Sequence, residues 1–219
     1  MKKVAIILSG CGNRDGSELQ ESLSLMLALD RHNITYQCFA PKTTFKVVSY
    51  LGDAVETGEE RNIYAEAARI ARGNILDLAS YQALHYDGLL LPGGMGAARN
   101  LSTYAFDGAN MKVLPEVERA ILETYKLSKP VAAVCIAPMV LAKVLGPMHV
   151  TLTLGNICAA SQIAELLGAQ HKVCIPSQAV IDHQNRVVTS PAYMVANRIS
   201  EIFDGAEAVV EGMLQLSKQ

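Results

Sequence analysis

The chain has 219 residues, of which half are hydrophobic and 18% are charged, and its formal net charge at pH 7 is −2. A chain of this length and composition can bury a core without disulfide bonds, which excludes a disordered protein, a coiled coil and a disulfide-stapled small fold. Because the charge is balanced and Lys and Arg form no run, we expect neither a nucleic-acid partner nor a membrane partner.

The N-terminal stretch KKVAIILSG predicts a buried strand over residues 4–8. Its apolar run reaches glycine too early for a secretory signal peptide, and no cleavage site follows. The five cysteines form no C-x-x-C pair and have no zinc-ligand spacing with the five histidines. We therefore expect no metal site and a protein that stays in the reducing cytoplasm.

Beyond this strand, short apolar runs alternate with longer segments of helical periodicity, and no linker or repeat interrupts them. This alternation predicts crossover units and hence one domain over residues 1–219, with a mostly parallel sheet and helices on both faces. In the first helix we expect Ser17 to be the N-cap, and the buried face to consist of Leu19, Leu23, Met26 and Leu27. The other predicted strands are 35–39, 88–91, 131–134, 150–154 and a strand–turn–strand unit at 180–190; the predicted helices are 17–32, 60–74, 115–129, 137–146, 159–169 and 193–216.

Cys135 lies where the predicted strand 131–134 passes directly into a helix, which is the layout of a nucleophile elbow. Small residues, Ala133 and Ala137, stand two positions before and after it, where this turn leaves little room. A cysteine at a helix N-terminus gains a more stable thiolate from the unpaired N–H groups, so the pattern indicates a nucleophile that is reactive near neutral pH. The alternative is a small buried residue of the core, the commoner environment of a free cysteine.

Two further stretches point to the same edge of the sheet. In DGLLLPGGMGAARNLS (residues 87–102), a buried strand leads into a Pro-Gly-Gly turn whose N–H groups could form an oxyanion hole or cradle a phosphate. Because neither nucleotide-binding glycine motif is present, we expect no nucleotide cofactor. In SGCGNRDGSELQE (residues 9–21), Glu18 either faces Cys135 and shares a proton with it or complements the helix dipole.

Taken together, the motifs ILSGCGNRDGSELQES, EERNIYAEAARIARG, LPGGMGAARNLS, CIAP and VVTSPAYM resemble the PfpI superfamily of class I glutamine amidotransferase-like proteins, and within it the ElbB (ES1) branch. The resemblance implies a flavodoxin-like three-layer sandwich with Cys135 on the elbow and Glu18 hydrogen-bonded to its sulfur. It also implies that the backbone N–H groups of Gly94 and Ile136 are the oxyanion donors, with Gly93 shaping the turn.

For function, the resemblance implies a homodimer that converts glyoxal or methylglyoxal to a hydroxy acid without an added cofactor, and a link to isoprenoid biosynthesis. The chain departs from relatives that pair cysteine with histidine, because the two places where histidine is expected hold Ile136 and the pair Gly155 and Asn156. A redox-sensing or chaperone-like role of an oxidisable Cys135 is therefore a second hypothesis. A cysteine hydrolase or amidase that recruits His149, His171 or an imidazole of another chain is the third.

Overall fold

The computed structural model describes residues 1–218, and over these residues a seven-stranded sheet forms the centre of the molecule. The strand order is β10-β11-β7-β6-β1-β2-β5, and every pair in it is parallel except β10 with β11. The strands are β1 (Lys3–Ile7), β2 (Thr35–Ala40), β5 (Ile75–Asp77), β6 (Gly88–Leu91), β7 (Val131–Val134), β10 (Val180–Asp182) and β11 (Val187–Ser190).

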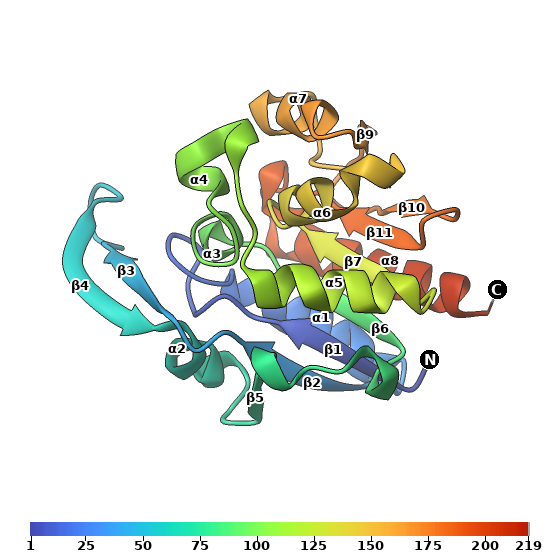
Figure 1. Ribbon diagram of the computed structural model, residues 1–219, viewed down its shortest axis with the longest axis horizontal. Helices are drawn as coiled ribbons and strands as arrows, with labels where there is room; N and C mark the ends of the chain where they lie inside the picture. Colours follow the sequence, from blue (N-terminus) through green and yellow to red (C-terminus); the bar gives the residue numbers. More distant parts are fainter. Residues whose placement is uncertain (219) are drawn as a thin grey trace.

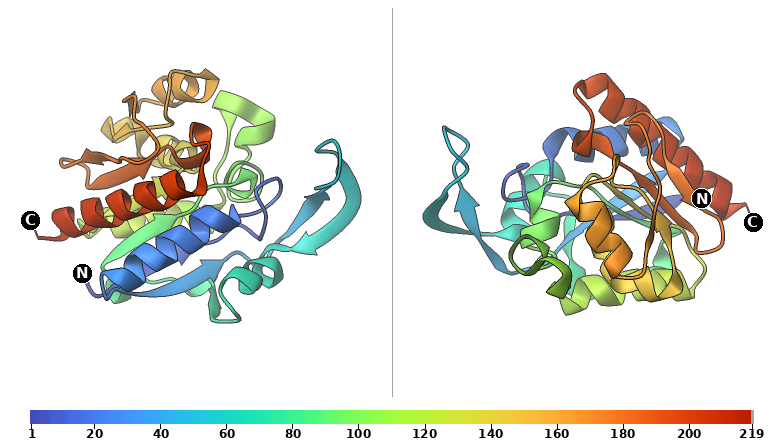
Figure 2. Two further views of the ribbon diagram at one scale, coloured as in Figure 1. Left: turned by 180° about the vertical axis from the view of Figure 1, so that it is seen from behind. Right: turned by 90° about the horizontal axis from the view of Figure 1, so that it is seen from above.

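Helices cover both faces of this sheet (Figures 1 and 2), as crossover connections between parallel strands require. Helices α1 and α8 lie side by side on one face, and α5 and α6 lie on the other. This arrangement confirms the expected flavodoxin-like α/β sandwich. The helices are α1 (Leu19–Arg31), α2 (Ile63–Ile70), α3 (Met95–Arg99), α4 (Tyr104–Asp107), α5 (Pro115–Lys126), α6 (Pro138–Leu145), α7 (Ala159–Leu166) and α8 (Ile199–Ser217).

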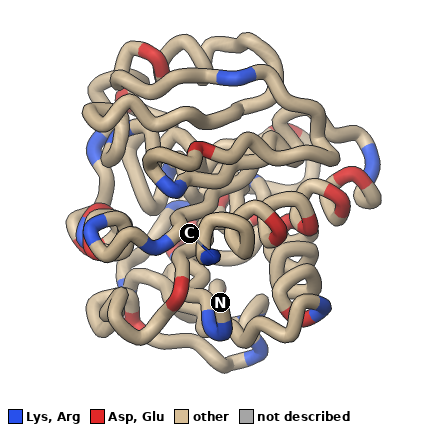
Figure 3. The backbone as a smooth tube through the Cα atoms, turned by 90° about the vertical axis from the view of Figure 1, so that its right-hand side faces the viewer, with Lys and Arg blue, Asp and Glu red and all other residues tan. Residues whose placement is uncertain are grey.

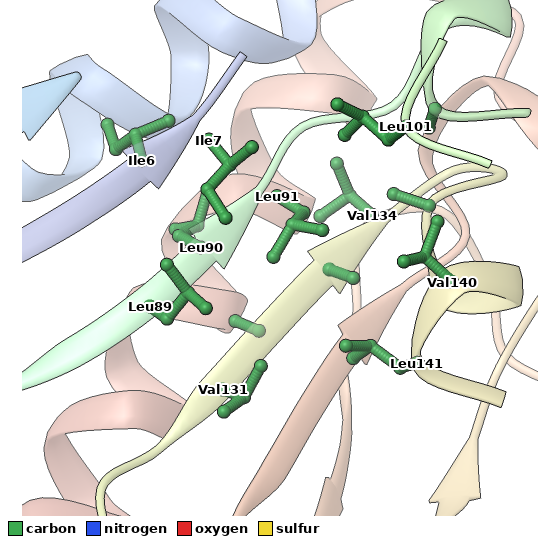
Figure 4. Close-up of a cluster of buried hydrophobic side chains, with 14 of the residues drawn as sticks. Ile6, Ile7, Leu89, Leu90, Leu91, Leu101, Val131, Val134, Val140 and Leu141 are labelled. Atoms are coloured by element: carbon green, nitrogen blue, oxygen red, sulfur yellow. The ribbon is translucent and has the colours of Figure 1, made fainter. Parts of the chain in front are cut away.

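The core is formed where β1, β6 and β7 run next to one another, each as a nearly continuous apolar run. Strands buried on both faces need no polar alternation, which is why these segments were recognisable from composition alone. Figure 4 shows their side chains packing together and against the N-terminal part of α6. This packing fixes the end of β7, and therefore the position of Cys135 directly after it.

Two pairs of strands lie outside the central sheet. The antiparallel hairpin β3 (Thr44–Val48) and β4 (Glu56–Asn62) projects from the body of the molecule (Figure 1). The sequence predicts no strand there and starts a helix at residue 60, whereas β4 continues to Asn62 and α2 begins at Ile63. The strand is not recognisable because β4, with almost every side chain exposed, shows no apolar alternation. The predicted strand 150–154 is reduced to β8 (Thr151–Leu152), which pairs with β9 (Gln170–His171) instead of joining the central sheet.

The prediction for the buried face of α1 is wrong. Leu19, Leu23 and Leu27 are 42%, 50% and 49% exposed, and of the expected set only Met26 is buried. The buried face instead runs through Leu25 and Leu29. The helix begins at Leu19 with Glu18, not Ser17, as its N-cap, because the Ser17 hydroxyl accepts the Ser9 N–H at 2.8 Å. Ser17 is therefore committed to the preceding loop.

Basic and acidic residues are interspersed over the face of the molecule drawn in Figure 3. Among residues 1–218, no helix combines the length and the apolar character that crossing a membrane requires.

Candidate active site

Cys135 occupies a strained turn between β7 and α6. Its φ angle is +60°, in the left-handed region that residues other than glycine rarely adopt. Its N–H donates to the Ser190 carbonyl of the neighbouring strand at 3.0 Å, and α6 begins three residues later at Pro138. A cysteine held in this way after a buried strand has the geometry expected of a nucleophile elbow.

The sulfur of Cys135 meets one buried carboxylate and two backbone N–H groups. The side chain of Glu21 and the N–H groups of Gly94 and Ile136 lie close enough to the sulfur to shift its pKa, Glu21 upward and the two N–H groups downward. Two backbone hydrogen bonds fix the orientation of the Glu21 carboxylate. Its Oε2 accepts the Gly93 N–H at 3.0 Å, and its Oε1 accepts the Tyr193 N–H at 3.3 Å. Gly94 and Ile136 line the same cavity as the sulfur, and their role as oxyanion donors stays a prediction.

Gly93 stands where a side chain could not fit. A Cβ atom there would lie 2.3 Å from Cys135 Cβ and 2.5 Å from Glu21 Oε2. At Gly94, φ is +91° and a Cβ would lie 2.4 Å from both the Glu18 nitrogen and the Gly16 oxygen. The Pro-Gly-Gly turn can therefore bring its backbone against the sulfur only because both positions lack side chains.

The expectation that Glu18 hydrogen-bonds the sulfur is contradicted by these contacts, because Glu21 occupies that place. Glu18 is the N-cap of α1, and its Oε2 accepts the Glu21 N–H at 2.6 Å. Glu21 lies one helical turn further on, at the position whose side chain points under the helix toward the sheet, and it is 1% exposed. The sequence did carry a signal for Glu21, since it lies four residues before Leu25 and eight before Leu29 on the buried face of α1.

The surroundings of Cys135 and Glu21 keep protons on the pair. Burial, and then the charge of Glu18, raises the pKa of Glu21 from 4.5 to about 7. Burial, and then the charge of Glu21, raises the pKa of Cys135 well above its ordinary value, although the N–H groups of Gly94 and Ile136 act in the opposite direction. This direction is opposite to the one expected from the helix terminus. Desolvation outweighs the helix terminus, and the thiol needs a base to become a nucleophile.

Cys135 is 8% exposed and opens on a cavity of about 580 Å³. This volume suits a small molecule. Of the site residues predicted from the sequence, Glu18, Gly94, Cys135 and Ile136 line this cavity, whereas Gly93 is not among its lining residues. The complete lining, which adds amide, phenol and thioether side chains, is Asn13, Glu18, Gln20, Gly94, Met95, Cys135, Ile136, Tyr193 and Met194.

Two polar side chains of neighbouring loops, and the two histidines of the hydrolase hypothesis, are not part of this lining. Arg14 donates to the carbonyl oxygens of Ser49 and Gly52, and Asn100 donates to those of Ser9 and Asp15. His149 and His171 are not among the cavity-lining residues. Over residues 1–218, no group of three or more His, Cys, Asp or Glu side chains is arranged to hold a metal ion.

Comparison with known proteins agrees with this geometry. No protein-family model matches the chain. The human glutamine amidotransferase-like class 1 domain-containing protein 3, mitochondrial, is 40% identical over 98% of this chain and 83% of its own length. The rat ES1 protein homolog, mitochondrial, is 38% identical over 98% of this chain and 84% of its own length.

A crystal structure of an isoprenoid biosynthesis protein with an amidotransferase-like domain from Ehrlichia chaffeensis superposes with a TM-score of 0.91 at 35% identity, covering 99% of both chains. A DJ-1 superfamily protein from Agrobacterium tumefaciens shares the fold with a TM-score of 0.56 at 16% identity, covering 100% of this chain and 89% of its own.

The relatives correct the expected location and establish the family. The prediction of a cytoplasmic protein is contradicted, because both curated relatives are named as mitochondrial proteins, which points away from a purely cytoplasmic location. That prediction rested on unpaired cysteines, which indicate a reducing compartment without saying which one. With 40% identity along nearly its whole length, the chain belongs to the ES1 family of glutamine amidotransferase-like class 1 proteins.

Proposed function

We propose that the chain is a cofactor-independent cysteine enzyme that converts glyoxal and similar α-oxoaldehydes to 2-hydroxy acids. The observation that carries the proposal is the surroundings of the Cys135 sulfur, which faces a cavity between two N–H donors and the buried carboxyl of Glu21. This set supplies a nucleophile, a proton acceptor and a place for an oxyanion, as addition to a carbonyl group requires.

In the first step, the sulfur attacks the aldehyde carbon while the thiol proton passes to Glu21. A carboxyl with a pKa of about 7 is a suitable base at neutral pH, because it is partly ionised there and still holds the proton it takes. The carbonyl oxygen becomes an oxyanion that accepts hydrogen bonds from the N–H groups of Gly94 and Ile136. Protonation of this oxygen by Glu21 gives a hemithioacetal.

The later steps need no outside oxidant or reductant. Removal of the proton from the former aldehyde carbon gives an enediol, and return of a proton to the neighbouring carbon gives the thioester of a 2-hydroxy acid. One carbon is oxidised and its neighbour is reduced by the same two electrons. Water then cleaves the thioester, which releases the 2-hydroxy acid and restores the Cys135 thiol.

The test is to measure formation of the hydroxy acid from glyoxal and from methylglyoxal. We expect Cys135→Ala to abolish turnover, and Glu21→Gln to lower kcat by about 10²- to 10⁴-fold through loss of the base. Cys158→Ala, which changes a cysteine outside the cavity lining, is the matched control and should keep wild-type turnover. Full turnover in folded Cys135→Ala would refute the proposal.

The two alternative functions find less support at the site. Oxidation follows thiolate character, and the raised pKa of Cys135 works against a redox sensor. Gain of two oxygens at Cys135 under mild peroxide, without turnover of any dicarbonyl, would favour sensing. A hydrolase or amidase needs an imidazole or an equivalent proton donor for the leaving group, and the residues lining the described cavity include no histidine. A covalent acyl-enzyme formed with activated esters would favour that role.

The proposal also includes a homodimer and a setting in isoprenoid biosynthesis. The homodimer is implied by the family resemblance, and the half-exposed Leu19, Leu23 and Leu27 of α1 offer an apolar surface for a second copy to cover. Sedimentation of the wild type and of Leu23→Glu tests the homodimer. A wild type that sediments as a monomer would rule the homodimer out. The isoprenoid setting is taken from the description of the Ehrlichia chaffeensis relative.

A further inference from the structure

The charged side chain that lines the Cys135 cavity is negative. Glu18 contributes a carboxyl group, Asn13 and Gln20 contribute amides, and Tyr193 contributes a phenol. Within the part of the chain that the structure describes, Lys, Arg and His are missing from this lining. A carboxylate or phosphate on a substrate would therefore enter without a cationic side chain to receive it.

Two arginines that are close to lining residues in sequence are committed elsewhere. Arg14 belongs to the same loop as Asn13, but its guanidinium donates to the carbonyl oxygens of Ser49 and Gly52. Arg99 lies at the end of the helix that begins at the cavity-lining Met95, and it pairs with Glu56 at 2.5 Å. Neither guanidinium is therefore available to offset negative charge in the cavity.

Glu21 and Cys135 add to the negative charge instead of reducing it. When the pair loses one of its two protons, either the carboxylate of Glu21 or the thiolate of Cys135 carries one negative charge beside the cavity. The two N–H groups at the sulfur can stabilise the charge of one oxyanion. A second anionic group on the substrate would repel both that charge and the carboxylate of Glu18.

We propose that this cavity selects carbonyl compounds that carry a cationic nitrogen, such as an ammonium or trimethylammonium group, and that Glu18 is the residue that recognises the cation. The remaining lining suits such a ligand, because the ring of Tyr193 and the thioethers of Met95 and Met194 can contact the methyl or methylene groups around the nitrogen. This inference deepens the proposed function and rests, like it, on the Cys135 sulfur being the reactive atom.

The test measures the rate at which Cys135 reacts with three methanethiosulfonates that carry a trimethylammonioethyl, a methyl or a sulfonatoethyl group. Each rate is divided by the rate of the same reagent with 2-mercaptoethanol, which removes the reagents' own differences. We expect the cationic reagent to exceed the anionic one by about tenfold after this division, as interaction with one to two partly screened charges requires. The preference should shrink as salt is added.

Variants assign this preference to Glu18. Glu18→Gln keeps an oxygen for the helix cap and removes the charge, so the ratio of cationic to anionic rates should fall several-fold. Gln20→Glu should raise the ratio, and Glu201→Gln, at a carboxylate on α8 outside the lining, should not change it. A ratio near one in the wild type, or a ratio that Glu18→Gln leaves unchanged, would overturn the inference. Because disulfide formation with the reagent needs no turnover, these outcomes are independent of whether any dicarbonyl is converted.

Discussion

At the scale of single residues, the site depends on the absence of side chains as much as on their presence. Cys135, Glu21 and the N–H of Gly94 converge because Gly93 leaves the space between them open. The sequence predicted the cysteine and both glycines, since a strand that ends in Pro-Gly-Gly and another that ends in cysteine must meet at one edge of a parallel sheet. It did not identify the correct carboxylate, because only the observed buried face of α1, which continues from Glu21 to Leu25 and Leu29, selects Glu21 over Glu18.

Gly93→Ala should disable the site. Its methyl group would overlap Cys135 Cβ and Glu21 Oε2, so one of the two side chains must move. We expect unfolding to require about 1–3 kcal/mol less free energy, the usual cost of overpacking, and turnover to fall by about 100-fold through misplacement of the sulfur.

The control for Gly93→Ala is Gly73→Ala, where a Cβ meets nothing within 4 Å but φ is +81°. That variant should lose about 1 kcal/mol through backbone strain alone and keep its turnover. Urea unfolding and a dicarbonyl assay on both variants separate the two effects. Equal turnover in the two proteins would show that Gly93 is not needed for the chemistry.

At the scale of helices and strands, α1 shows where periodicity is ambiguous. Its sequence LQESLSLMLALDR has leucine at alternate positions from Leu23 to Leu29, so two different faces are equally apolar. Only the packing of α1 against the sheet and α8 selects the face with Leu25 and Leu29. By contrast, β6 and β7 were predicted to the residue, because a strand buried on both sides leaves no choice of face.

Leu25→Ala and Leu23→Ala test this assignment. Leu25 is 1% exposed, so its truncation should lower the free energy of unfolding by about 2–5 kcal/mol. Leu23 is half exposed, and its truncation should change the stability of the monomer by no more than about 0.5 kcal/mol. Urea unfolding at a low, fixed protein concentration makes the comparison. Similar losses in both variants would contradict the observed face of α1.

The β3–β4 hairpin, which the sequence patterns did not predict, is hydrogen-bonded to a loop of the site. The carboxylate of Asp15 accepts the Val48 N–H at 2.9 Å and the Tyr50 hydroxyl at 3.0 Å. The same loop carries Asn13, whose carbonyl accepts the N–H of Met95 at 2.8 Å, next to the Pro-Gly-Gly turn. The hairpin therefore connects to the cavity through a buried carboxylate.

Asp15→Ala should loosen this connection. The Val48 N–H would lose its buried partner, which costs about 1–3 kcal/mol of stability. We expect faster tryptic cleavage within residues 44–62 and a higher KM for the dicarbonyl. Asp53→Ala, at an exposed carboxylate in the same hairpin, is the control and should be cleaved at the wild-type rate. Equal cleavage of the two variants would remove the link between Asp15 and the hairpin.

At the scale of the whole molecule, the alternation of apolar runs and helices was sufficient to predict the sandwich, because few topologies join parallel strands through right-handed crossovers. The edges of the molecule were less predictable. The β8–β9 pair joins two-residue strands on either side of α7, and the projecting hairpin, although local in sequence, has exposed side chains without apolar alternation in β4.

The buried carboxyl of Glu21 should make the stability of the whole fold depend on pH. Its pKa is raised from 4.5 to about 7 on folding, so between these values the folded protein binds a proton that the unfolded chain has released. Stability must then fall as the pH rises through this window, by about 3 kcal/mol in total, and the slope due to Glu21 ends near pH 7. Urea unfolding of the wild type and Glu21→Gln at pH 4.5, 5.5, 6.5 and 7.5 measures the difference between their two pH dependences. Taking that difference cancels the other titrating groups and any constant cost of the amide. If both proteins show the same pH dependence, Glu21 is not the buried proton carrier beside Cys135.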